Sequence, residues 1–161
     1  MTELDEIVGT LRTALADIPA AVTFADLPNG RAIGSESAEI PPALRDLLLV
    51  TDGPRCGSIV VFAMSELDDN QFYCDELAGG TTNWLCYGMI DDNPLFLNRA
   101  DEDVWWFPGG VADRINGRLA RLADDLATFV TRYLFGEQYP EVVTGGAQDR
   151  WYAFRQNVRA G

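Results

Sequence analysis

The sequence contains no histidine and no lysine. All 12 of its basic side chains are arginine, in a chain of 161 residues. Without histidine there can be no serine–histidine triad, no imidazole general base and no histidine-ligated metal. Without lysine there can be no Schiff base and no phosphate-binding lysine of the P-loop kind. Most familiar catalytic and nucleotide-binding arrangements are therefore excluded.

Cysteine is also scarce. The three residues are Cys56, Cys74 and Cys86, and none of them forms a CxxC pair. Zinc sites made from cysteine alone usually need four, arranged as close pairs. A nucleophilic cysteine would need a basic partner such as histidine. We expect three reduced, buried thiols, and we expect no metal site and no cofactor.

Long apolar runs are missing, and nothing approaches the roughly 20 apolar residues of a membrane span. Residues 1–17 are acidic and amphipathic. They have neither the basic start nor the continuous apolar segment of a signal peptide. We therefore expect the protein to be cytoplasmic.

Positive charge is in short supply as well. There are 25 acidic residues against 12 basic ones, which gives a formal net charge of −13 and a pI near 4.2. Such a surface repels phosphate backbones and anionic lipid headgroups. We expect no nucleic-acid partner and no membrane partner. A basic protein or a metal cation suits the charge better.

The apolar content, 47%, is ordinary for a globular protein. Apolar residues recur at helical spacing over residues 3–16, 42–52 and 118–134, and the last of these is the most regular pattern in the chain. Short runs at 58–62, 84–90, 94–98 and 104–107 are typical of strands, and the last three are separated by acidic turns. A final short helix is expected around Trp151, Phe154 and Val158. Residues 20–39 are expected to form a loop with at most one short strand, and the acidic residues 66–80 are expected to be irregular. We expect one α+β domain over residues 1–161, a mostly antiparallel sheet packed by three or four helices.

Three segments resemble the SMI1/KNR4 (SUKH) superfamily. Residues 40–48 give a proline followed by an amphipathic helix, which ends at Thr51-Asp52-Gly53. Residues 84–98 resemble the central hairpin of the family: Tyr87-Gly88 leads to an acidic turn and then to Leu95-Phe96-Leu97. Residues 119–134 resemble its last helix. The match covers about residues 36–136, and it implies an SMI1/KNR4-like fold.

The resemblance also implies a function. Bacterial members are commonly immunity proteins that bind and neutralise toxins, often nucleases or deaminases. Fungal relatives regulate cell-wall synthesis. The family has no established catalytic motif, so a protein that binds a toxin domain, and is not an enzyme, is the expectation for this chain.

An acidic cluster is the main candidate for the binding surface. Apart from Arg99, no basic residue interrupts residues 66–103. The candidate partner-binding residues are Asp68, Asp69, Asp75, Glu76, Asp91, Asp92, Asp101, Glu102, Asp103 and Trp105. Their carboxylates could imitate nucleic-acid phosphates and enter the basic cleft of a toxin. They could equally be solvated turns, and two of the turns would lie at opposite ends of one strand.

Other interpretations remain open. A calcium loop is disfavoured, because residues 65–70 and 101–103 lack the D-x-D-x-D-G pattern. Trp105 and Trp106 are neighbours on a strand and should point to opposite faces, so one of them could be an exposed anchor. A regulatory protein-binding scaffold is an alternative to the immunity protein, and a hydrolase using paired carboxylates is a weaker one. The sequence does not fix the oligomeric state.

Overall fold

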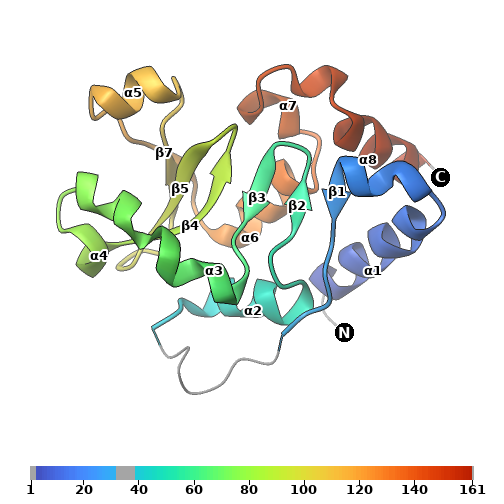
Figure 1. Cartoon of the computed structure of the whole chain (residues 1–161), viewed down its shortest axis with the longest axis horizontal. Coiled ribbons are helices and arrows are strands. Elements are labelled where there is room, and N and C mark those ends of the chain that lie inside the picture. The colour runs from blue at the N-terminus through green and yellow to red at the C-terminus, as the bar shows by residue number, and fades with distance from the viewer. Residues whose placement is uncertain (1–2, 32–38, 161) are drawn as a thin grey trace.

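The computed structural model describes residues 3–31 and 39–160. It has a single seven-stranded sheet in which every neighbouring pair is antiparallel and the strands lie in chain order, β1 to β7. The strands are β1 (Ala25–Asp26), β2 (Arg55–Cys56), β3 (Ile59–Val61), β4 (Trp84–Ile90), β5 (Asn93–Asn98), β6 (Val104–Trp106) and β7 (Ala120–Ala123). The expected α+β class with an antiparallel sheet is confirmed (Figure 1).

Helices surround this sheet. The α-helices are α1 (Glu3–Ala16), α2 (Pro42–Val50), α3 (Met64–Leu67), α4 (Gly80–Asn83), α5 (Val111–Ile115), α6 (Leu126–Phe129), α7 (Tyr139–Val142) and α8 (Arg150–Ala160). Further helical turns are η1 (Pro19–Thr23), η3 (Asp68–Glu76), η4 (Val130–Leu134, of π type) and η5 (Gly146–Gln148). Among the α-helices of the described chain, only α1, α2 and α8 reach nine residues, and the 3-10 helix η3 also has nine.

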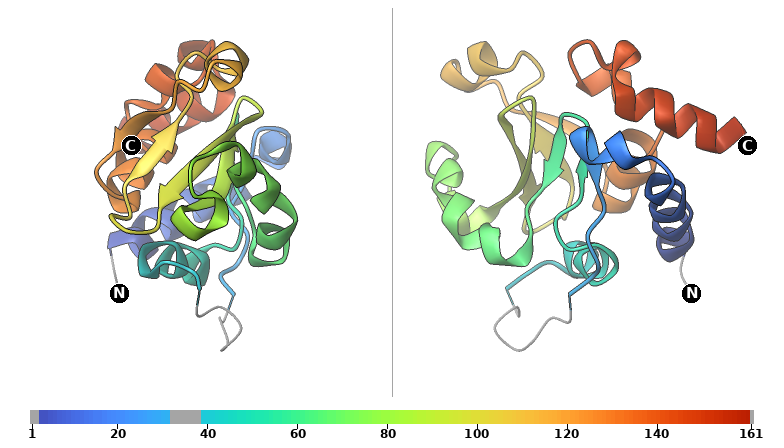
Figure 2. Two further views of the ribbon diagram at one scale, coloured as in Figure 1. Left: turned by 90° about the vertical axis from the view of Figure 1, so that its left-hand side faces the viewer. Right: turned by 45° about the vertical axis from the view of Figure 1, so that its right-hand side comes forward.

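The helices lie on both sides of the sheet. Figure 2 shows α3 and α4, with η3 between them, on one side, and α1, α6 and α8 on the other. Two neighbouring residues of β4 contact one group of helices each. The backbone of Cys86 is hydrogen-bonded to Gln71 of η3, whereas the ring of Tyr87 packs edge-on against Phe129 of α6, with 5.9 Å between centroids. One hydrophobic core joins sheet and helices, and it includes Leu44 of α2.

The hairpin of β4 and β5 lies at the centre of the sheet. Ile90 pairs with Asn93, which leaves Asp91 and Asp92 as a two-residue turn with φ of 49° and 68°. Positive φ at both positions is the signature of a type I′ turn, whose twist matches that of the strands. Gly88 is required by packing, because a Cβ there would lie 2.3 Å from the carbonyl oxygen of Val60 on β3.

Most predicted elements are confirmed. α1 covers residues 3–16 as expected, α2 lies within the predicted 42–52 helix, and Gly53 stops it with a φ of +84°. The strands predicted at 58–62, 84–90, 94–98 and 104–107 correspond to β3 to β6. The final helix is present as α8. Of the loop expected between residues 20 and 39, and of the 36–136 match, residues 32–38 fall outside the described residues.

The helix predicted over residues 118–134 is wrong in its first part. Residues 120–123 form the edge strand β7, in which Ala123 pairs with Val104 and Ala120 with Trp106. The helix begins only after Asp125, whose Oδ1 accepts a hydrogen bond from the Thr128 amide at 2.7 Å. Aspartate at that position is a strong helix start signal. Residues 120–123 pair with the edge of β6, although the spacing of their apolar residues alone fits a helix.

The acidic segment of residues 66–80 was expected to be irregular, and this is also wrong. It is helical almost throughout, as α3 and η3. Glu66 supports the start of α3 by accepting a hydrogen bond from the Ala63 amide at 3.0 Å, and Asp52 accepts one from the Met64 amide at 2.8 Å. Within residues 3–31 and 39–160, none of the helices has the length and apolar character needed to cross a membrane.

Candidate protein-binding surface

The nine acidic candidate residues fall into three separate groups, and the tenth candidate, Trp105, lies on β6. Asp68, Asp69, Asp75 and Glu76 are exposed on η3. Asp91 and Asp92 form the turn between β4 and β5, whereas residues 101–103 belong to the turn between β5 and β6. These two turns lie at opposite ends of β5, as the sequence indicated. The structure therefore does not bring the ten residues into one continuous acidic patch.

Asp103 is not a surface residue. It is only 6% exposed, and its carboxylate accepts a hydrogen bond from the indole Nε1 of Trp105 at 2.8 Å. Arg121 of β7 lies 3.8 Å from its other oxygen. This carboxylate fixes the β6–β7 edge of the sheet, and it is not accessible to a partner. The prediction that Asp103 belongs to an accessible binding surface is therefore wrong.

Trp105 is half-buried and is not a free anchor. Its indole packs edge-on against Trp84, with 5.8 Å between ring centroids, and its N–H donates a hydrogen bond to the carboxylate of Asp103. Trp106 is also half-buried. The sequence left open two possibilities, an exposed tryptophan anchor and a sheet covered on both faces, and neither tryptophan is prominently exposed.

The η3 helix is tied firmly to the sheet by Gln71. β3 ends at Val61, whose partner on β4 is Gly88, and the Phe62 amide makes a last bond to the Tyr87 carbonyl. Beyond that point the side chain of Gln71 replaces the missing strand. Its Oε1 accepts from the Cys86 amide at 3.0 Å, and its Nε2 donates to the Cys86 carbonyl at 2.8 Å. The acidic residues of η3 are thus presented on a fixed support.

α5 is held beside η3 by one arginine. The guanidinium of Arg114 binds both carboxylate oxygens of Glu76, each at 2.9 Å, and lies 5.1 Å from the centroid of the Tyr73 ring. These hydrogen bonds lower the pKa of Glu76 and raise the pKa of Arg114. Because both side chains are partly exposed, the pair contributes less than about 1 kcal/mol to stability. Its main effect is to orient α5.

Large apolar side chains are exposed on the same two elements. Phe72 on η3 is 57% exposed, and Val111 and Ile115 on α5 are 61% and 79% exposed. Glu76, Arg114 and the two α5 side chains line an open hollow between the elements. The sequence reasoning missed these three apolar residues. The short apolar spacing of Val111 and Ile115, enclosed by glycines, was the only signal available.

Acidic and apolar side chains therefore share one region. We call it the η3–α5 surface, made of Asp68, Asp69, Phe72, Asp75, Glu76, Val111 and Ile115. Figure 1 shows η3, between α3 and α4, on the same side of the sheet as α5. Exposed apolar groups rimmed by charge are typical of protein interaction sites.

The cysteines form no comparable site. All three are buried, and none of them forms a disulfide. Burial raises the pKa of Cys56 and of Cys74, and it raises the pKa of Cys86 to about 12. A thiol held in its neutral form is a poor nucleophile and a poor metal ligand.

The shifted carboxyl groups also do not suggest acid catalysis. The pKa of Asp125 is lowered by hydrogen bonds from Thr128, as that of Glu76 is by Arg114. A general acid working at neutral pH needs a shift in the other direction. In the described part of the chain, no group of three cysteine, aspartate or glutamate side chains is placed to hold a metal ion.

What the η3–α5 surface offers is thus carboxylates, apolar side chains and a rigid base, which suit recognition of a basic protein surface. No protein-family model matches the chain, and no curated protein matches it.

Proposed function

We propose that this chain is a cytoplasmic, non-catalytic binding protein of the SMI1/KNR4 type that neutralises a bacterial toxin by occluding the toxin's basic site. The observation that carries the proposal is the η3–α5 surface, where exposed carboxylates and exposed apolar side chains lie on two neighbouring elements. A nuclease or deaminase that acts on nucleic acid has a basic cleft, and this surface is its complement in charge.

The charge supports both selectivity and speed. A net charge of −13 attracts a basic partner over a range limited by salt screening, about 8–10 Å at physiological ionic strength. Steering of this kind raises association rates roughly 10- to 1000-fold at low salt. The same field repels nucleic acid and anionic membranes, so it favours the toxin over the toxin's own substrate.

The apolar side chains supply the affinity. Aromatic side chains near the centre of an interface carry much of the binding free energy. Phe72 lies among the carboxylates of η3 and is more than half exposed. Burial of its ring against a partner would remove this apolar area from water, which is the main favourable term in association.

The arrangement of the three family-like segments is further support. They form α2, the β4–β5 hairpin, and the segment of β7, α6 and η4, all of which contribute to one core. The third segment departs from the helix that the resemblance implies, because it begins as the strand β7.

Two variants of the η3–α5 surface and one control test the proposal. Phe72→Ala removes the apolar anchor, and Asp75→Arg reverses a charge on the same helix. Asp17→Arg reverses an exposed charge just after α1, which lies on the other side of the sheet (Figure 2). Each tagged protein is used to capture partners from lysate of the source cell, and rates are then measured with the purified partner.

The expected partner is basic and has nuclease or deaminase activity that the wild-type protein inhibits at one-to-one stoichiometry. Asp75→Arg should slow association by about threefold or more at low salt and little at high salt. Phe72→Ala should speed dissociation by about thirtyfold, the effect of losing about 2 kcal/mol. Asp17→Arg should leave both rates within twofold. Capture of a regulatory or cell-wall protein would instead favour the scaffold.

A further inference from the structure

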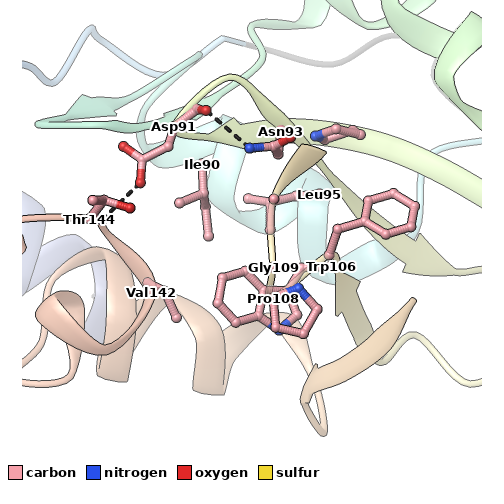
Figure 3. Close-up of a pocket in the computed structure, with 12 residues that line it drawn as sticks. Ile90, Asp91, Asn93, Leu95, Trp106, Pro108, Gly109, Val142 and Thr144 are labelled. Carbon is pink, nitrogen blue, oxygen red and sulfur yellow. Dashed lines mark hydrogen bonds between the residues drawn. The ribbon is translucent and has the colours of Figure 1, made fainter. Parts of the chain in front are cut away.

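A second site lies at the β4–β5 turn, away from η3. A cavity of about 250 Å³ is enclosed by this turn, by the segment that follows β6, and by the end of α7 (Figure 3). Apolar side chains make part of its wall, among them Ile90, Leu95, Trp106 and Val142, and polar groups make the rest. The volume is below that of most sites for drug-sized ligands, about 300–1000 Å³, and suits a group the size of one side chain.

Two residues beside the cavity have oxygen atoms with unused hydrogen-bonding capacity. Oδ2 of Asp91 accepts a hydrogen bond from the Thr144 amide at 2.9 Å, while its Oδ1 accepts none within the described residues. The amide nitrogen of Asn93 donates to the Asp91 carbonyl at 3.1 Å, but its Oδ1 is buried without a partner. An unpaired buried acceptor is costly, about 1–3 kcal/mol.

Among the described residues, no basic side chain lines the cavity. Figure 3 shows Asp91 and Asn93 along one side, with Trp106 and Pro108 facing them across Ile90 and Leu95. A ligand that fits needs a donor-rich positive end for the Asp91 carboxylate, and a short apolar stem for the apolar part of the wall. An anion would be repelled by the Asp91 carboxylate, and a neutral apolar group would leave the free oxygen of that carboxylate unsatisfied.

We propose that this cavity binds an alkylguanidinium or alkylammonium group. The group can come from a free small molecule or from an arginine or lysine side chain of a protein. In the second case the inference rests on the proposed function, because the cavity then receives a basic anchor residue of the toxin.

The turn provides a matched pair of variants. Asp91 and Asp92 both have positive φ, a conformation that asparagine tolerates well. Asp91→Asn removes the charge inside the cavity and can still accept a hydrogen bond from Thr144. Asp92→Asn removes the same charge from the exposed neighbour, which does not line the cavity.

The test is a calorimetric titration of the wild-type protein and both variants with butylguanidinium, with butylammonium and with neutral butylurea. We expect the two cations to bind and butylurea to bind at least about tenfold more weakly. Asp91→Asn should lose about tenfold or more in affinity for the cations, as expected for loss of a charge-assisted hydrogen bond, and Asp92→Asn should stay within twofold. Absence of cation binding at millimolar concentration would overturn the inference, and so would equal losses in the two variants.

A second arm distinguishes the source of the cation. The Asp91→Asn and Asp92→Asn proteins are assayed against the purified partner beside Phe72→Ala. If the partner inserts a basic side chain, only Asp91→Asn of the turn pair weakens its binding. If Asp91→Asn binds the partner normally yet loses the free cations, the site serves a small molecule. If Phe72→Ala also binds the partner normally, the proposed function fails while the cation site stands.

Discussion

Replacing Gln71 by alanine tests how η3 is attached to the sheet. The side-chain amide of Gln71 satisfies both backbone groups of Cys86, with bonds of 3.0 and 2.8 Å, and Cys86 is fully buried. Without the side chain, one N–H and one C=O lose their partners, each at a cost of about 1–3 kcal/mol. We therefore expect Gln71→Ala to lower the free energy of unfolding by roughly 2–6 kcal/mol. For a chain of this size, that corresponds to a fall of about 4–24 °C in Tm.

Thermal and urea unfolding followed by circular dichroism measure this loss. Asn70→Ala is the control, because the adjacent Asn70 bonds only the Glu66 carbonyl and its hydrogen bond is exposed. We expect it to cost less than about 1 kcal/mol. If Gln71→Ala were no more destabilised than Asn70→Ala, η3 would not be completing the edge of β4, and the rigid support of the η3–α5 surface would be refuted.

Two further predictions concern ionisable groups. Asp125→Ala should cost about 1 kcal/mol at pH 7 through loss of the helix cap. The pKa of Asp125 is lowered in the folded protein, so its contribution to the free energy of unfolding is present above the ordinary aspartate pKa of about 3.9. That contribution is lost as the pH falls through the pKa of the folded state. Urea titrations at pH 7 and pH 3 should therefore show that the difference in stability between Asp125→Ala and wild type is smaller at pH 3. A constant difference would contradict this assignment. Cys56, Cys74 and Cys86 should resist a thiol reagent at pH 8 in the native protein and react together once urea unfolds it, because burial raises the pKa of all three. Rapid labelling of any one in the folded state would be inconsistent with this packing.

Local patterns were sufficient to predict the centre of the sheet. An apolar and aromatic run at 84–90, two aspartates, and a second apolar run specify a hairpin wherever the chain places it. The amphipathic spacing of residues 3–16 likewise specifies α1 without help from the rest of the fold. These elements agree with their own local preferences, which is why they could be predicted.

Pairing over long distances decided the elements that were missed. The sequence of residues 118–134 has helical spacing, but the free edge of β6 recruited its first part as β7. The roles of the acids were also set by their neighbours in space. Asp103 is buried by Trp105 and Arg121, and Glu76 is paired with Arg114, which is 38 residues away. Charge and composition indicated an acidic surface, but only the fold separates carboxylates that remain free from those with structural partners.

The central claim is that the η3–α5 surface binds a basic protein. The most direct test is the affinity of the purified partner for wild-type, Phe72→Ala and Asp17→Arg proteins, measured at low and high salt. The account predicts tight binding by the wild-type and Asp17→Arg proteins that weakens as salt rises, with a loss of about thirtyfold in Phe72→Ala. Equal affinity of Phe72→Ala and the wild-type protein, or binding that is indifferent to salt, would contradict it.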